Sequence, residues 1–165
     1  MSTIIIPSYV VVPPSVEPIT VEQAKRVHRV LYDIEDADIA DLIQSAREAA
    51  EHYLGQSLVT QTREVGLSSY VEGMTLPYGP VQSVLTVGTD DPVIVQYVAG
   101  YPPVAESDPV NYVGNIPKSI IRAMHLLIGD GIEHREQSIV GGAFDSLPLG
   151  VQWHLNWHRA RRGFG

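Results

Sequence analysis

The amino-acid sequence predicts a mainly α-helical fold with a small antiparallel β insertion, which is an α+β protein. We expect a bundle of about four helices, preceded in the chain by an extended Pro-rich N-terminal arm. Apolar residues recur at helical spacing over residues 39–54 and again over residues 120–128. Between these segments, residues 57–101 are rich in Val, Thr and Tyr and are interrupted by Gly and Pro, which is typical of short strands joined by turns. Residues 1–18 contain four prolines, which remove backbone donors and disfavour helix, so we expect an extended arm there that lies on the body of the protein or on a neighbour.

The first helix is predicted to begin at about Val21. Thr20 and Gln23 have the spacing of a capping box, in which each side chain bonds the other residue's backbone N–H. We expect this helix to extend to about Leu31. Its predicted apolar stripe comprises Ala24, Val27 and Leu31.

The second helix has the clearest pattern in the sequence. Asp36 and Asp38 suit the positive N-terminal end of a helix. Gly55 stands where a left-handed C-terminal cap belongs. The apolar residues between them lie on one helical face: Ile39, Leu42, Ile43, Ala46, Ala50, Tyr53 and Leu54.

The β insertion is predicted to form a small antiparallel sheet. Its candidate strands are residues 58–66, 74–78, 81–87 and 93–98. The segment that follows, residues 102–116, contains three prolines and is predicted to be a loop.

Two further helices are predicted after this loop. Pro117 opens the third helix within its first turn, where a missing donor costs nothing. This helix is apolar on several sides and is predicted to be the buried centre. Gly129 and Gly131 indicate either close packing or the helix end. A flexible Gly-rich loop over residues 138–147 and a last helix over residues 148–161 complete the prediction.

Size and composition limit the possible functions. A chain of 165 residues with 44% hydrophobic residues fits one soluble domain, residues 1–165. Its net charge of −8 argues against a protein that wraps DNA as a monomer, because such a protein needs a basic surface. The chain has no cysteine, so it offers neither disulfides nor thiolate metal ligands. No segment is typical of an export signal or a membrane span.

Residue patterns typical of catalysis are weak throughout the sequence. His154 and His158 lie four residues apart on the last predicted helix and could share a metal. The stretch between them lacks the glutamate of the zinc-protease pattern, so solvated or interface histidines are the preferred interpretation. We therefore expect no catalytic residues, no cofactor and no bound metal, and we predict that the chain is not an enzyme.

The C-terminal residues are basic in an otherwise acidic chain, and two tryptophans adjoin them. Trp and Arg are enriched at interface hot spots, which makes this end a candidate partner-binding site. The alternative is a helix end whose cations offset the helix dipole, with both tryptophans in the core. The candidate site residues are Trp153, Trp157, Arg159, Arg161 and Arg162.

Taken in order, several segments resemble the family of phage head–tail connector proteins, also catalogued as putative DNA-packaging proteins of prophages. The resemblance covers roughly residues 15–160, and it depends on the order and spacing of the segments more than on any one of them. These are residues 18–25, 53–62, 80–84, 98–101, 116–120, 134–136 and 147–151.

This resemblance implies a head–tail adaptor in the neck of the virion, assembled in the host bacterial cytoplasm. Copies of the chain would form a ring, typically of twelve, under the portal protein. The ring would extend the DNA channel without reading the DNA sequence, and it would offer a platform to the next neck or tail protein. We expect the C-terminal helix to dock on the portal, so that deletion of residues 153–165 would abolish portal binding without unfolding the domain.

Two alternative functions stay open at this point. Another neck component, such as a stopper or a tail terminator, would share most of these features. A DNA-packaging accessory factor would need a basic recognition helix. The helix predicted from Pro117 carries only Lys118 and Arg122, and the second helix carries only Arg47. The particle could be a phage, a defective prophage or a gene transfer agent.

Overall fold

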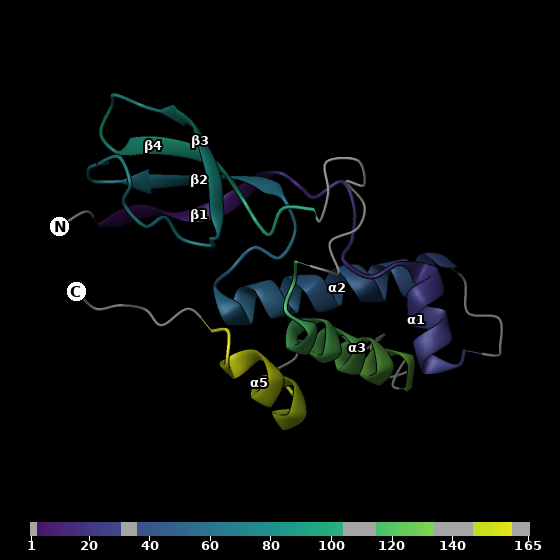
Figure 1. The fold of residues 1–165 in the computed structure, drawn as a ribbon. Coiled ribbons are helices and arrows are strands. Elements are labelled where there is room, and N and C mark those ends of the chain that lie inside the picture. Colours follow the sequence, from purple (N-terminus) through teal and green to yellow (C-terminus); the bar gives the residue numbers. More distant parts are fainter. Residues whose placement is uncertain (1–2, 31–35, 104–114, 134–146, 160–165) are drawn as a thin grey trace. The chain divides into compact units, whose positions relative to one another are not determined.

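The computed structural model describes residues 3–30, 36–103, 115–133 and 147–159, and the chain divides into two compact units (Figure 1). The first unit, Met1–Val16 with Gly55–Asn115, contains a four-stranded antiparallel sheet. The second unit, Glu17–Leu54 with Ile116–Gly165, contains the helices. These elements confirm the predicted α+β class, whereas a single domain and a four-helix bundle stay predictions.

Four helices lie in the described part of the second unit. They are α1 (Val21–His28), α2 (Asp36–Leu54), α3 (Lys118–Glu133) and α5 (Leu149–Asn156). Helices α2 and α3 each contact the other three. In the described ranges, none of the helices has the length and apolar character that a membrane crossing requires.

Helix α1 begins with the predicted capping box. Thr20 Oγ1 accepts a bond from the Gln23 backbone N–H at 3.2 Å, and Gln23 Oε1 accepts one from the Thr20 N–H at 3.0 Å. The helix ends at Arg29, whose left-handed backbone (φ 50°) turns the chain away before the predicted end. Ala24 is buried as expected, but Val27 is exposed, and Leu31 lies outside the described residues.

Helix α2 begins and ends where the sequence predicts. Its apolar face is buried through five residues, namely Ile39, Ile43, Ala46, Ala50 and Leu54. The cap residue Gly55 has a positive φ of 66°, a conformation that glycine adopts without steric cost.

Helix α3 follows Pro117, whose carbonyl oxygen accepts a bond from the Ile120 N–H at 2.9 Å. It continues through Gly129 and Gly131 to Glu133, so these glycines do not mark its end. A β-carbon at Gly131 would lie 2.5 Å from Leu42 Cδ2. The close-packing alternative is therefore correct, and the absent side chain lets α3 approach α2.

The sheet has the strand order β1-β2-β4-β3, in which every neighbouring pair is antiparallel. Its strands are β1 (Ile4–Val12), β2 (Gln61–Leu67), β3 (Val81–Val87) and β4 (Val93–Ala99). Three of the predicted strands are confirmed. The predicted strand at residues 74–78 is wrong, because this segment is irregular apart from an isolated bridge between Tyr78 and Gln56, and its Leu76 side chain packs on the sheet. The predicted Gly-rich loop at residues 138–147 lies outside the described residues, apart from Leu147.

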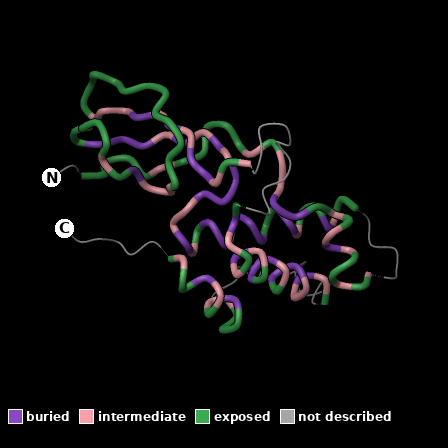
Figure 2. Tube along the Cα trace, in the orientation of Figure 1, coloured by how far each residue is buried: buried purple, intermediate pink, exposed green. Residues whose placement is uncertain are grey.

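The fourth strand of the sheet comes from the predicted N-terminal arm. Ile4–Val12 is extended as expected, and it lies on the body of its own unit as the outer strand β1, paired with β2. Ser8 Oγ lies 2.8 Å from Tyr97 Oη and accepts a bond from Arg63 Nε at 3.0 Å. These contacts attach β1 to the core face of the sheet. The buried residues of the sheet lie on the central strands β2 and β4 (Figure 2).

Candidate partner-binding helix

Helix α5 carries the candidate site, and it is shorter than the predicted helix over residues 148–161. It begins after Pro148, whose carbonyl oxygen accepts a bond from the Gln152 N–H at 3.0 Å. At the other end, the N–H groups of His158 and Arg159 both donate to the Leu155 carbonyl oxygen, at 2.9 and 3.1 Å. These shared bonds close the last turn, with Trp157 still in a helical conformation.

Helix α5 has apolar residues on two opposite faces. Val151 and Leu155, four residues apart, are 1% and 0% exposed and attach the helix to its unit. Leu149, Trp153 and Trp157 recur at the same four-residue interval on another face, where they are 84%, 62% and 76% exposed. A soluble helix normally has one apolar face, so this exposed stripe indicates an interaction surface.

Side-chain contacts hold the C-terminal turn of α5 against α2 and α3. Tyr53 of α2 donates a hydrogen bond from its hydroxyl to Asn156 Oδ1 at 2.9 Å, and the Arg159 guanidinium lies 5.1 Å from the centre of the Tyr53 ring. Ser119 Oγ of α3 lies 2.6 Å from His158 Nε2. The exposed stripe is therefore presented on a fixed support, which reduces the entropy lost when a partner binds.

The structure brings together three of the five predicted site residues, Trp153, Trp157 and Arg159, on α5 and the turn after it. Both tryptophans are exposed, so the alternative that placed them in the core is wrong. Arg161 and Arg162 lie outside the described residues. Leu149 was missed, although its four-residue spacing to Trp153 and Trp157 could have indicated it.

The two histidines considered as metal ligands have other contacts. His154 packs edge-on against Trp153, with ring centroids 4.9 Å apart, and His158 contacts Ser119 as described. Within the four described ranges, no group of three or more His, Asp or Glu side chains is placed to hold a metal ion.

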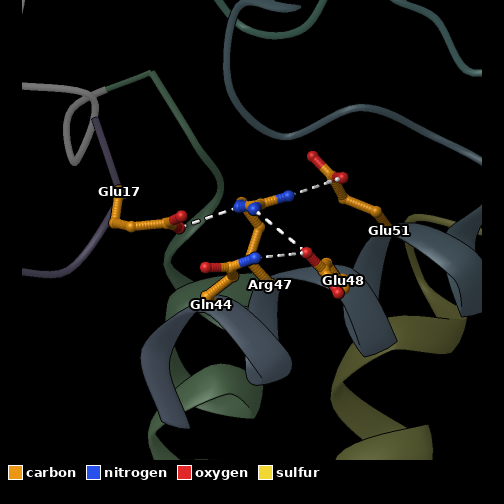
Figure 3. Close-up of polar contacts among 5 residues, drawn as sticks. All are labelled: Glu17, Gln44, Arg47, Glu48 and Glu51. Atoms are coloured by element: carbon orange, nitrogen blue, oxygen red, sulfur yellow. Dashed lines mark hydrogen bonds and ion pairs between the residues drawn. The ribbon is translucent and has the colours of Figure 1, made fainter. Parts of the chain in front are cut away.

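Arg47, the one arginine of α2, lies among carboxylates (Figure 3). Its guanidinium contacts Glu17 at 2.8 Å, Glu51 at 3.2 Å and Glu48 at 3.5 Å, and Gln44 donates a further bond to Glu48. Arg47 is only 5% exposed. It therefore connects the segment before α1 to α2 and does not present its charge to a phosphate backbone.

A surface depression of about 470 Å³ lies between α1, α3 and the start of α5. His28 Nε2 and His125 Nδ1 are buried there without a hydrogen-bond partner in the described structure, and the two rings are 5.5 Å apart. Burial is the main cause that lowers the pKa of both histidines. Arg122, Asp130 and Glu133 also line the depression.

Comparison with known proteins identifies relatives at the level of family and fold. The sequence profile of the family described as "Phage gp6-like head-tail connector protein" matches residues 18–159. A chain of the structure described as "Virion of native gene transfer agent (GTA) particle" is similar with a TM-score of 0.70 and 18% identity, over 96% of this chain and 97% of that one. No curated protein sequence matches significantly.

Two further solved structures are similar over almost the whole length of both chains. One is described as "Neck of empty GTA particle computed with C6 symmetry", with a TM-score of 0.65, 19% identity and coverage of 100% of this chain and 98% of that one. The other is described as "Neck of native GTA particle computed with C12 symmetry", with a TM-score of 0.61, 18% identity and 98% coverage of both chains. At these identities the similarity establishes a common fold.

Proposed function

Since this chain belongs to the phage gp6-like head–tail connector protein family, we propose that it is a head–tail adaptor, a structural protein of the virion neck. The observation that carries this proposal is the family match over residues 18–159. The family is described by its connecting role in a particle and not by a reaction. In this proposal the chain assembles in the host cytoplasm, catalyses no reaction, and serves a phage, a prophage particle or a gene transfer agent.

The adaptor acts as a closed ring of identical subunits around the DNA channel. The fold is shared with neck chains of particles computed with C6 and C12 symmetry, which supports a ring of twelve. Each subunit contributes a net charge of −8. A collar of this charge repels the phosphate backbone, so DNA passes through it without sequence-specific binding.

The ring binds the portal protein on one side and the next neck or tail protein on the other. We assign the portal contact to α5, whose exposed stripe comprises Leu149, Trp153 and Trp157. Tryptophan side chains that fill pockets on a partner dominate the binding energy of many interfaces. The adjoining Arg159, Arg161 and Arg162 add positive charge for a carboxylate-bearing surface.

The adaptor assignment is tested by mixing the purified chain with its cognate portal protein and imaging the product by negative-stain electron microscopy. The expected result is a collar on the narrow end of the portal. Rings that associate only with tail proteins would instead assign the chain to a stopper or tail terminator. A shifted DNA band in a low-salt gel assay, without portal binding, would assign it to DNA packaging.

The proposed portal contact of α5 is tested with substitutions and not with the truncation that the sequence suggested. Deleting residues 153–165 removes Leu155, which is completely buried, so the truncated chain is expected to lose stability as well as binding. The double substitution Trp153→Ser and Trp157→Ser changes only exposed side chains. We expect it to weaken portal binding at least a hundredfold, whereas Val27→Ser, at an exposed apolar position of α1, leaves binding unchanged.

A further inference from the structure

The sheet of the first unit ends in two outer strands, β1 and β3. In the described part of the chain, each of these strands pairs on one side only, β1 with β2 and β3 with β4. The outer side of each strand therefore has backbone N–H and C=O groups that no neighbouring strand satisfies. Such an edge is a template for pairing with another chain.

Both edges lack the charged residues that normally protect an outer strand. The sequence of β1 is IIIPSYVVV and that of β3 is VQSVLTV, and neither contains a charged side chain. Every residue of β3 is exposed, and every residue of β1 except Ser8 is exposed. Pro7 and several register irregularities shape the edges, but the apolar segments 9–12 and 84–87 stay open to solvent.

Strand direction makes the two edges complementary to each other. Because each neighbouring pair is antiparallel in the order β1-β2-β4-β3, strands β1 and β3 have opposite directions. If a second copy continues the sheet in the same orientation, its β3 lies beside β1 and antiparallel to it. The strand direction thus alternates across the junction between subunits as it does within one subunit.

We propose that β1 of one subunit pairs with β3 of the next, so that the sheets of neighbouring copies are continuous around the ring. This inference rests on the proposed ring-forming function and assigns its subunit contact. The two edges are different surfaces, which is what a head-to-tail interface requires, and such an interface closes into a ring when the rotation fits. Each edge of a subunit is therefore occupied by another copy of the same chain, one on the β1 side and one on the β3 side.

Disulfide trapping tests the pairing directly, because the chain contains no cysteine. Four double variants combine Val10→Cys or Val11→Cys on β1 with Val84→Cys or Leu85→Cys on β3, which samples both faces and adjacent registers. After mild oxidation of assembled rings, at least one pair is expected to give a ladder of covalent multimers on a non-reducing gel. Each single-cysteine variant should give dimers at most.

Lysine substitution provides a second, independent measurement. Leu85→Lys places a charge on the β3 edge and is expected to reduce the fraction of chain in rings at least tenfold at equal concentration. Val71→Lys is the matched control, since Val71 is 69% exposed in a turn of the same unit and lies outside the four strands. Equal ring formation by both variants would contradict the proposal.

The outcomes separate this inference from the proposed function. Rings seen by electron microscopy without any ladder from the four pairs would overturn the β1–β3 contact and leave the adaptor role intact. Absence of rings under all conditions, with and without portal, would contradict the adaptor role itself. Trapping of an edge cysteine to a portal or tail protein instead of a second copy would also overturn the inference.

Discussion

Gly100 and Val59 approach each other so closely that a β-carbon on Gly100 would lie 2.2 Å from the Val59 carbonyl oxygen. Gly100 follows strand β4 and has a φ of 119°, a conformation that residues with a β-carbon rarely adopt. Its N–H donates to the Pro80 carbonyl oxygen at 2.9 Å. Because Gly100 has no side chain, the end of β4 can approach both the Val59 segment and the Pro80 segment at the end of the sheet.

Gly100→Ala is therefore expected to destabilise the first unit strongly. The added β-carbon meets backbone, which cannot rotate away, and the positive φ adds strain, so we expect a loss of about 3 kcal/mol in the free energy of unfolding. Gly73→Ala is the control, because Gly73 also has a positive φ (84°) but has open space around it. It should cost about 1 kcal/mol. Equal losses in urea denaturation would contradict the steric argument.

The ion pairs of Arg47 lead to a second prediction. Arg47→Met removes the cation that Glu51 contacts, so the Glu51 carboxylate, in a residue that is only 5% exposed, loses its ion pair with Arg47. We expect a loss of about 3 kcal/mol in unfolding free energy. Glu48→Gln changes an exposed partner of the same arginine and should cost less than about 0.5 kcal/mol. A small effect of Arg47→Met would show that its contacts contribute little to stability.

Local signals in the sequence predicted the helices well. The Thr20–Gln23 capping box, the apolar face of α2 and the Gly55 cap depend on residues close together in the chain, and the structure confirms each of them. The position of β1 could not be predicted in this way. Its pairing with β2 joins Ile4 to Leu67, and such long-range pairing leaves no periodic signal in an extended Pro-rich segment.

The candidate site was predicted only in part for a similar reason. The tryptophans and Arg159 were identified by residue type, but their exposure depends on which face of α5 packs on α2 and α3. Val151 and Leu155 are as apolar as Leu149, so composition alone could not separate the buried face from the exposed one. The segment at residues 74–78 was predicted as a strand from its composition and its flanking Gly and Pro residues, but Leu76 is buried by packing on the sheet and not by pairing in it.

The histidine pair predicts that stability depends on pH. Burial lowers the pKa of His28 and His125 below the value of about 6.5 expected in the unfolded chain. The charge of Glu133 raises the pKa of His28 and so opposes the effect of burial. Arg122 lowers the pKa of both histidines, and His28 also lowers the pKa of His125. The unfolded chain therefore binds more protons in acid, so the stability contributed by these groups is present above about pH 6.5 and is lost as the pH falls through their folded values.

We expect the urea midpoint of the wild-type chain to fall between about pH 7 and pH 5. The double substitution His28→Asn and His125→Asn should flatten this dependence, even if it lowers the midpoint at pH 7. His52→Asn, at an exposed position of α2, should leave the dependence as in the wild type. Parallel pH curves for the wild type and the double variant would show that other groups are responsible.

Substitutions on the two faces of α5 are expected to differ strongly in how much stability they cost. Trp153→Ala and Trp157→Ala remove side chains that are 62% and 76% exposed, so each should change the unfolding free energy by less than about 0.5 kcal/mol. Leu155→Ala empties a completely buried site and should cost about 2–5 kcal/mol.

The fluorescence of the chain reports on the same stripe, because Trp153 and Trp157 are its only tryptophans. Since both are exposed, the emission of the free chain should be close to that of tryptophan in water and strongly quenched by acrylamide. Portal binding should move the emission to shorter wavelengths and reduce quenching, because the indole rings become buried. A shift on ring formation without portal would instead assign the stripe to the contact between subunits, and an unchanged spectrum in a verified portal complex would exclude the stripe from both interfaces.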